Sequence, residues 1–324
     1  MKVLLTTTSF QDTPGTHHDI LREAGFEVVP ERGPLPESRM LELVGEIDAL
    51  LCGDDEITEK VVDHALPKLK VISKYGIGLD KITVDYVTEK GIPLTYCPGV
   101  NHTTVAEHVF GLMLALFRKI VVEANHVASG KWIRLTGNEI MGKTIAIIGL
   151  GRIGKEMVVR ANAFGMKPVA FDLYWDEQFA LANQVEKCPS IDHALAVADV
   201  ISLHVNLSSQ TRDLINRESI SKMKKGVVIL NCARGEIVNA TDLIDALHSG
   251  QVGGYGADVL DLEPPPSDYP LLRAPNTVIT PHIGSRTYES VRRQAGMAAK
   301  NLVLAMRGEK PLALANNVKL TAHM

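Results

Sequence analysis

The 324-residue chain has few cysteines, no long apolar run and no excess of basic charge. Its four cysteines, Cys52, Cys97, Cys188 and Cys232, form no Cys-x-x-Cys pair, which disfavours a zinc site or a disulfide framework and predicts a reducing, cytoplasmic location. The chain contains no stretch of roughly 18 apolar residues, so we expect no membrane span, and its apolar start is too short for a signal peptide. The net charge of −4 provides no basic surface for nucleic acid or an anionic membrane.

The first hundred residues alternate short β-rich segments with amphipathic segments. The expected strands are Val3–Thr7, Glu27–Val29, Ala49–Cys52, Val71–Ser73 and Ile92–Thr95. The expected helices are His17–Ala24, Pro36–Val44, Thr58–Ala65 and Thr83–Lys90, and the helix-ending glycines Gly25 and Gly91 follow two of them. This order predicts an α/β unit with a parallel sheet covered by helices on both faces.

A second series of the same kind begins near Lys143 and runs to about Ile283, so a chain of this length reads as two α/β units. Its expected strands are Thr144–Ile148, Pro168–Phe171, Val200–Leu203, Val227–Asn231, Gly256–Asp258 and Val278–Thr280. A last helix is expected over Arg286–Met306.

Between the two series, Asn101–Ile120 is apolar nearly all round at helical spacing. Thr103 or Thr104 is the expected N-cap, with Glu107 in the first turn. Such a helix is buried, either between two domains or in the core of one.

A glycine-rich turn connects the first strand of the second series to a helical segment. Gly149 permits the tight turn, Gly151 lets a pyrophosphate approach the backbone, and Gly154 lets helix and strand pack closely. Asp172 follows the next strand, 18 residues past Gly154, where a carboxylate binds ribose hydroxyls and repels a 2′-phosphate. The alternative is a purely structural turn. The complete pattern favours a dinucleotide site for NAD rather than NADP.

Arg234, Glu263 and His282 each follow one of the apolar strand segments of the second series. Because the carboxyl ends of parallel strands face the ligand crevice, we expect the three side chains to meet there. An imidazole transfers protons near neutral pH, a neighbouring carboxylate orients it and favours its protonated form, and a guanidinium binds carboxylate and carbonyl oxygens. Each residue alone also has a structural interpretation. His108, on the apolar helix, is expected to be structural or solvent-facing. No metal site is expected.

In the first series, Lys74–Asp80 carries alternating glycines directly after a strand. Gly76 and Gly78 expose backbone N–H groups that can form an anion-binding nest for a substrate carboxylate. An ordinary turn is the alternative.

These residues resemble the D-isomer-specific 2-hydroxyacid dehydrogenase family, particularly its phosphoglycerate-dehydrogenase-like members. The motifs that carry the resemblance over nearly the whole chain are Lys74–Asp80, Ala106-Glu107, Gly149–Gly154, Asn231–Gly235, Asp258 to Glu263-Pro264-Pro265, and Pro281–Gly284. The resemblance implies Arg234 as substrate anchor, Glu263 as orienting acid and His282 as proton donor or acceptor. The cofactor contacts that it implies are Gly149, Gly151, Arg152, Ile153, Gly154, Asp172, His204, Thr211, Cys232, Ala233, Asp258 and Gly284. The substrate contacts are Tyr75, Gly76, Ile77, Gly78, Asn101, Arg234 and His282.

The resemblance also implies two doubly wound parallel-sheet domains. Residues 1–100 plus 285–324 would form a discontinuous, flavodoxin-like substrate domain, and residues 101–284 a Rossmann-type NAD domain. Family members are usually homodimers, with the Gly130-Lys131-Trp132 region reaching the partner.

The implied reaction is NAD-dependent interconversion of a small D-2-hydroxy acid and its 2-oxo acid. A 3-phosphoglycerate-like substrate is the first choice and hydroxypyruvate or glyoxylate the second. Two departures from the family pattern bear on this choice. Asn206 replaces a usual proline, and the acidic loop Asp54-Asp55-Glu56 would repel a phosphate unless it faces away, which leaves Lys74 and Arg134 as phosphate partners.

Other functions predict different features. An NAD-sensing, corepressor-like binding protein would need an exposed apolar peptide groove, for which the sequence gives no signal. Formate enzymes of this superfamily carry glutamine at the position of Glu263, and phosphite oxidation is a further alternative.

Overall fold

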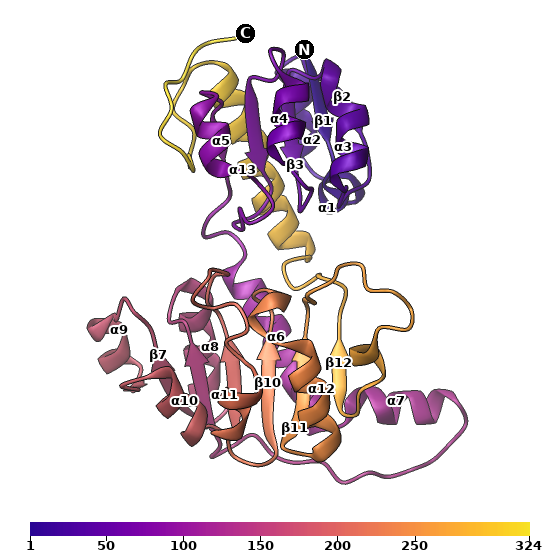
Figure 1. Ribbon diagram of the computed structural model, residues 1–324, viewed down its shortest axis with the longest axis vertical. Coiled ribbons are helices and arrows are strands. Elements are labelled where there is room, and N and C mark those ends of the chain that lie inside the picture. Colours follow the sequence, from indigo (N-terminus) through magenta and orange to yellow (C-terminus); the bar gives the residue numbers. More distant parts are fainter. The chain divides into compact units, whose positions relative to one another are not determined.

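The computed structural model describes residues 1–324, which divide into two compact units. Unit 1 consists of Met1–Asn101 and Arg286–Met324, and unit 2 consists of His102–Ser285. Each unit contains one parallel sheet with helices on both faces (Figure 1). The expected fold class, two doubly wound parallel-sheet α/β domains, is confirmed.

The sheet of unit 1 has the strand order β2-β1-β3-β4-β5, which is the flavodoxin-like order. Its strands are β1 (Lys2–Leu5), β2 (Glu27–Pro30), β3 (Ala49–Cys52), β4 (Val71–Lys74) and β5 (Leu94–Thr95). Its helices are α1 (Thr8–Asp12), α2 (His17–Glu23), α3 (Glu37–Leu43), η1 (Val44–Glu46), α4 (Glu59–Ala65), α5 (Val84–Glu89) and α13 (Tyr288–Met306).

Both faces of this sheet are buried, because successive strand residues enter different cores. Val3 and Leu5 of β1 pack in the core that contains the α13 residues Ala298 and Leu302, whereas Leu4 packs in the core on the other side. Gly25 and Gly91 follow α2 and α5 with φ of 78° and 70°, as the sequence predicts for helix ends.

The sheet of unit 2 has seven parallel strands in the order β12-β11-β10-β9-β6-β7-β8. The strands are β6 (Thr144–Ile148), β7 (Lys167–Phe171), β8 (Glu186–Lys187), β9 (Val200–Leu203), β10 (Val227–Asn231), β11 (Val252–Ala257) and β12 (Thr277–Ile279). The chain order reverses between β6 and β9, which is the switch point where open α/β sheets of the Rossmann type bind ligands.

Helices cover both faces of this sheet, whereas α7 extends away from it (Figure 1). The helices of unit 2 are α6 (His102–Phe117), α7 (Ile120–Ala128), α8 (Arg152–Ala163), α9 (Glu177–Ala182), α10 (Ile191–Val197), α11 (Arg217–Ser221), η2 (Gly235–Ile237), α12 (Ala240–Ser249) and η3 (Pro270–Arg273). Helix α6 lies close to β11: a Cβ added at Gly256 would be only 3.2 Å from the Leu112 Cβ, so the absence of a side chain at Gly256 permits the approach.

Several boundaries differ from the sequence prediction. Helix α6 begins at His102, so Thr103 and Thr104 lie inside its first turn and neither is the N-cap. It ends at Phe117, and Lys119 adopts a left-handed φ of 55° before α7 begins. The sequence also missed α1, α7 and the two-residue strand β8.

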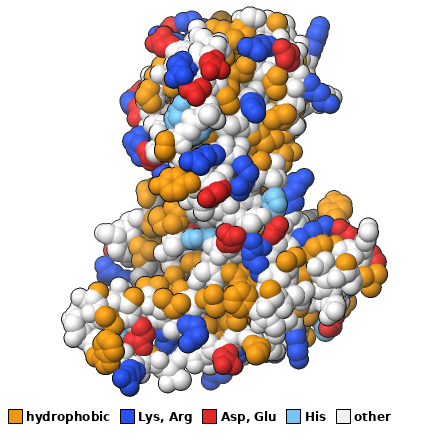
Figure 2. Space-filling view, turned by 180° about the vertical axis from the view of Figure 1, so that it is seen from behind, with side chains coloured by type: hydrophobic (Ala, Val, Ile, Leu, Met, Phe, Trp, Pro, Cys, Tyr) orange, Lys and Arg blue, Asp and Glu red, His pale blue; other side chains and the backbone are white.

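Acidic and basic side chains are interspersed over the face of the molecule shown in Figure 2. No helix of the structure combines the length and apolarity needed to cross a membrane.

Candidate active site

The segments that carry Arg234, Glu263 and His282 leave neighbouring strands at the same edge of the sheet of unit 2. Strand β11 lies between β10 and β12, with Ala257 paired to Asn231 on one side and to Ile279 on the other. The expected arrangement of three functional segments after three adjacent parallel strands is therefore present.

The Arg234 segment packs directly on the segment that leads to Glu263. A Cβ on Gly235 would lie 1.9 Å from the Leu260 carbonyl carbon, so the two backbones can approach only because residue 235 is glycine. Asn231 Nδ2 donates a 2.8 Å hydrogen bond to the Arg234 carbonyl oxygen and fixes the turn from the other side.

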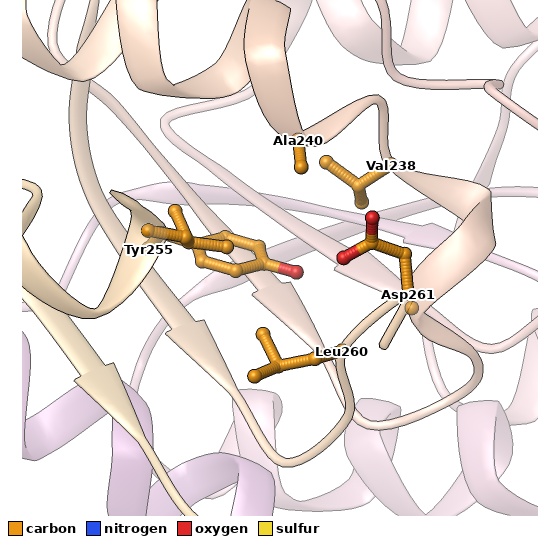
Figure 3. Close-up of a pocket in the computed structure, with 7 residues that line it drawn as sticks. Val238, Ala240, Tyr255, Leu260 and Asp261 are labelled. Carbon is orange, nitrogen blue, oxygen red and sulfur yellow. The ribbon is translucent and has the colours of Figure 1, made fainter. Parts of the chain in front are cut away.

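A small pocket lies beneath this contact (Figure 3). The buried Tyr255 ring extends into it with its hydroxyl toward Asp261, and Val238, Ala240 and Leu260 complete the wall (Figure 3). The side chains that line it support the turn at Gly235 from below.

Glu263 and His282 form a hydrogen-bonded pair. The Glu263 Oε2 atom lies 2.8 Å from His282 Nδ1, and Glu263 Oε1 accepts a 2.7 Å hydrogen bond from the Leu260 N–H. Because a carboxylate only accepts, the Nδ1 atom of His282 carries the hydrogen of this bond. Both side chains are about one third exposed, at 37% for His282 and 34% for Glu263.

The backbone of His282 is left-handed, with φ of 54°. For an L-residue this conformation costs about 1–2 kcal/mol, so neighbouring contacts must maintain it. The His282 N–H donates to the Asp258 carbonyl oxygen at 2.9 Å. The Asp258 carboxylate accepts from the N–H groups of Ile283 at 2.9 Å and Gly284 at 2.6 Å. Asp258 therefore holds the backbone at His282 and at the two residues after it.

The carboxylate of Asp258, an expected nicotinamide contact, is thus turned into the loop that bears His282. Burial by itself would raise the pKa of Asp258, but hydrogen bonds from His108, Thr280 and the loop N–H groups outweigh it and lower the pKa below its usual value. The carboxylate is consequently charged at neutral pH.

Sequence reasoning missed His108 and Thr280. The His108 Nε2 atom lies 2.8 Å from Thr280 Oγ1 and 3.4 Å from Asp258 Oδ1. The sequence assigned His108 to a structural or solvent-facing position. Its helical periodicity could not reveal the contact, because Thr280 is 172 positions away in the chain.

The glycine turn after β6 has the geometry of a dinucleotide site. A Cβ on Gly154 would lie 2.1 Å from the Gly149 carbonyl oxygen, and one on Gly149 would lie 2.7 Å from the His204 carbonyl oxygen. A Cβ on Gly151 would meet nothing within 4 Å, so open space lies above the N-terminus of α8. That helix begins at Arg152, and its free N–H groups and positive dipole end suit a pyrophosphate.

Asp172 lies at the end of β7 and contacts this turn. One carboxylate oxygen accepts from the Leu150 N–H at 2.6 Å, and the other accepts from the Tyr174 N–H at 2.7 Å. The half-buried carboxylate therefore braces the glycine turn, and its charge disfavours a second phosphate beside it. The chain fits NAD at this position.

The other expected nucleotide contacts lie on the loops after β9 and β10. Burial lowers the pKa of His204 to about 3, so its ring is neutral, and Ser202 Oγ lies 2.8 Å from its Nε2. Thr211 Oγ1 donates to the Asn206 carbonyl oxygen at 2.6 Å and closes the loop in which Asn206 replaces the usual proline. Burial raises the pKa of the Cys232 thiol, which stays protonated.

The expected substrate contacts Tyr75, Gly76, Ile77 and Gly78 follow β4, and Asn101 follows β5. The Tyr75 side chain belongs to the core of unit 1, and its backbone N–H donates to the Cys52 carbonyl oxygen at 2.8 Å. Gly76 has φ of 125°, and Ile77 is exposed. The Asn101 side-chain oxygen has no hydrogen-bond partner.

The acidic loop after β3 points its three carboxylates to different partners. Asp54 Oδ1 lies 2.6 Å from the Nζ of Lys74, a residue whose side chain is 3% exposed. Asp55 is buried and accepts from the N–H groups of Leu35 and Gly53. Glu56 accepts from the N–H of Glu37. The loop is therefore held together by its own carboxylates.

Comparison with known proteins gives a consistent result. Residues 110–284 match the family model for the NAD binding domain of D-isomer specific 2-hydroxyacid dehydrogenases. A glyoxylate reductase of Thermofilum pendens is 40% identical over 308 residues, covering 92% of this chain and 90% of that one. A D-3-phosphoglycerate dehydrogenase of Methanocaldococcus jannaschii is 38% identical over 98% of this chain but only 59% of that longer protein.

Solved structures agree with the sequence matches. The crystal structure of D-lactate dehydrogenase from Aquifex aeolicus, complexed with NAD and lactic acid, has a TM-score of 0.86 and 26% identity, covering 98% of this chain and 99% of that one. The family model spans more than half of this chain, and the relatives match nearly all of it. The chain therefore belongs to the D-isomer-specific 2-hydroxyacid dehydrogenase family and is an NAD-dependent oxidoreductase.

Proposed function

We propose that the chain interconverts a small D-2-hydroxy acid and its 2-oxo acid, with His282 as the general acid and base. The observation that carries this proposal is the 2.8 Å hydrogen bond between His282 Nδ1 and Glu263 Oε2. It fixes the ring and its tautomer, and it leaves Nε2 for proton transfer. NAD, when bound, supplies or accepts the hydride.

Each side chain has a distinct role in this proposal. During reduction, His282 Nε2 donates a proton to the carbonyl oxygen as negative charge develops there, and in the reverse direction it removes the hydroxyl proton. The Glu263 carboxylate stabilises the positive charge on the ring. Arg234 binds the substrate carboxylate and carbonyl oxygen through its planar guanidinium. In unit 1, the backbone N–H groups of Gly76–Gly78 and the side chain of Asn101 are further candidates for carboxylate binding.

We further propose an unphosphorylated substrate, glyoxylate or hydroxypyruvate. The relatives named glyoxylate reductase and D-3-phosphoglycerate dehydrogenase do not choose between the two substrate classes. The ion pair between Lys74 and Asp54 favours an unphosphorylated acid, because Asp54 neutralises the lysine two residues before Gly76. The Lys74 side chain also lies beneath the nest, with its Cε 3.6 Å from the position of a Cβ on Gly76.

A panel of 2-oxo acids tests both levels of the proposal. NADH oxidation should proceed with glyoxylate and hydroxypyruvate at a kcat/KM at least about tenfold above that for phosphohydroxypyruvate. Asp54→Asn removes the counter-ion of Lys74 and should shift this ratio toward the phosphorylated acid by about tenfold. Glu56→Gln, in the same loop but facing Glu37, is the matched control.

The outcomes separate the reaction from its substrate. Oxidation of NADH by none of the acids would rule out the proposed reaction. A wild-type preference for phosphohydroxypyruvate, or an Asp54→Asn ratio no different from that of Glu56→Gln, would rule out only the unphosphorylated substrate.

We also propose that the protein is a homodimer. Helix α7 has no buried residue, and Ile120, Val122 and Val127 are each about half exposed. Trp132 follows it at 77% exposure. In Figure 1, α7 and the segment after it extend away from the sheet of unit 2. A second copy of the chain would cover these apolar side chains.

We propose a cytoplasmic location on the basis of the cysteines. All four are free thiols in the structure. Burial raises the pKa of Cys52 and Cys97 to about 12, so neither forms a reactive thiolate at neutral pH. Free, unreactive thiols suit a reducing compartment.

A further inference from the structure

We propose that His108 is a positioning residue for His282. It fixes the Asp258 carboxylate through Thr280, and Asp258 in turn holds the backbone of the loop that carries His282. The inference rests on the proposed role of His282 as the proton-transferring group, and it assigns to α6 a part in preparing that group.

The hydrogen positions in this cluster follow from the partners. Thr280 Oγ1 lies 2.6 Å from Asp258 Oδ1. Because the charged carboxylate only accepts, the single hydroxyl hydrogen of Thr280 is donated to Asp258. Thr280 Oγ1 must therefore accept at its 2.8 Å contact with His108. The His108 ring consequently carries its hydrogen on Nε2, and the chain of donors runs from His108 through Thr280 to Asp258.

His108 reaches this cluster because α6 lies against β11. The helix approaches the strand where Gly256 leaves no side chain between them, with Leu112 one turn after His108. His108 Nε2 also lies 3.4 Å from Asp258 Oδ1, so His108 contacts both Thr280 and Asp258.

Asp258 transmits the contact to His282. Its two carboxylate oxygens bind the N–H groups of the two residues after His282, and its carbonyl oxygen binds the N–H of His282 itself. With His108 removed, the carboxylate loses a neighbouring donor and gains freedom to rotate. The left-handed backbone of His282 then relaxes toward the more common conformations, and Nε2 moves away from its position for proton transfer.

The substitution that tests this inference is His108→Leu, which removes the hydrogen-bonding ring nitrogens and leaves an apolar side chain of similar size. It should lower kcat for the best 2-oxo acid by about 10- to 100-fold while the KM for NADH stays within about threefold. His108→Gln, which retains an N–H donor, should recover most of the loss. Thr280→Val should cause a similar loss, and the double variant should be no worse than the poorer single variant, because both residues act through Asp258.

A second readout does not depend on turnover. Amide hydrogen exchange at Ile283 and Gly284, measured on the protein without NAD, should be at least about tenfold faster in His108→Leu. His193→Leu is the matched control, since it makes the same substitution at an exposed position on α10 of the same unit. It should change neither exchange nor kcat.

The results distinguish the inference from the proposed function. Unchanged exchange at Ile283 and Gly284, unchanged kcat, or a loss that His108→Gln does not recover would overturn the positioning role. A wild-type protein that oxidises NADH with none of the acids would instead overturn the proposed reaction.

Discussion

His282 is held by its side chain and by its backbone, through two carboxylates with different tasks. Glu263 contacts the ring and is itself bound by the Leu260 N–H. The Asp258 carboxylate binds the N–H groups of Ile283 and Gly284 in the loop after His282. One carboxylate thus orients the imidazole ring, and the other holds the backbone of its loop.

Asp172 also has two tasks, because the carboxylate that is expected to bind the ribose hydroxyls braces the glycine turn through the Leu150 N–H. Its charge and its acceptor capacity can be separated by substitution. Asparagine keeps one oxygen that can accept from Leu150 but removes the negative charge, whereas alanine removes both.

Asp172→Ala should weaken NADH binding and reduce the preference for NADH over NADPH by about tenfold or more. Asp172→Asn should lose the preference but bind NADH more tightly than the alanine variant does. The measurement is the dissociation constant of each cofactor by fluorescence titration, with Asp192→Ala on the surface of α10 as the control. An unchanged cofactor ratio in Asp172→Ala would mean that Asp172 does not reach the ribose.

At this scale, the sequence reveals residues whose partners are close in the chain. The strand, the glycines, the helix and Asp172 form one continuous segment, so their order could be interpreted directly. The role of Asp258 as an acceptor for the His282 loop, and the contact of His108 with Thr280, depend on how α6 packs against β11. No local pattern contains that information.

Among the secondary-structure elements, strands with continuous apolar runs were predicted most closely. Strands β3, β6, β9 and β10 have the bounds expected from their apolar runs. Strand β11 begins four residues earlier than expected, because its glycines obscure the β pattern while they allow α6 to approach. Helix α7 was missed because none of its residues is buried. Its sequence therefore lacks the separation into an apolar core-facing side and a polar solvent-facing side that marks a packed helix.

Helix α7 and the segment after it give the prediction for the quaternary structure. Trp132→Glu places a charge on a side chain that is 77% exposed in one chain. If a second copy covers this side chain, burial of the charge should raise the dimer dissociation constant by at least about 100-fold, as measured by sedimentation equilibrium. Leu181→Glu on α9, at 72% exposure, is the matched control. A monomeric wild type, or a dimer that Trp132→Glu leaves intact, would contradict the homodimer.

At the scale of the whole molecule, the two parallel sheets have different strand orders. Unit 2 contains the nucleotide turn, Arg234 and the Glu263–His282 pair, all after the carboxyl ends of strands. Unit 1 contains Gly76 and Gly78, which follow β4 and are the proposed carboxylate contacts. The alternation of strands and helices was sufficient to predict this architecture. The substrate could not be predicted, because the pairing of Lys74 with Asp54 depends on the folded loop.

The central claim is that His282, paired with Glu263, transfers the proton in an NADH-dependent reduction of a small 2-oxo acid. The most direct test is the turnover of NADH by His282→Ala with the best acid of the panel, with NADH binding measured in parallel. We expect kcat to fall by about two to four orders of magnitude while the dissociation constant for NADH stays within about threefold. A variant that retains near-wild-type turnover would contradict the claim.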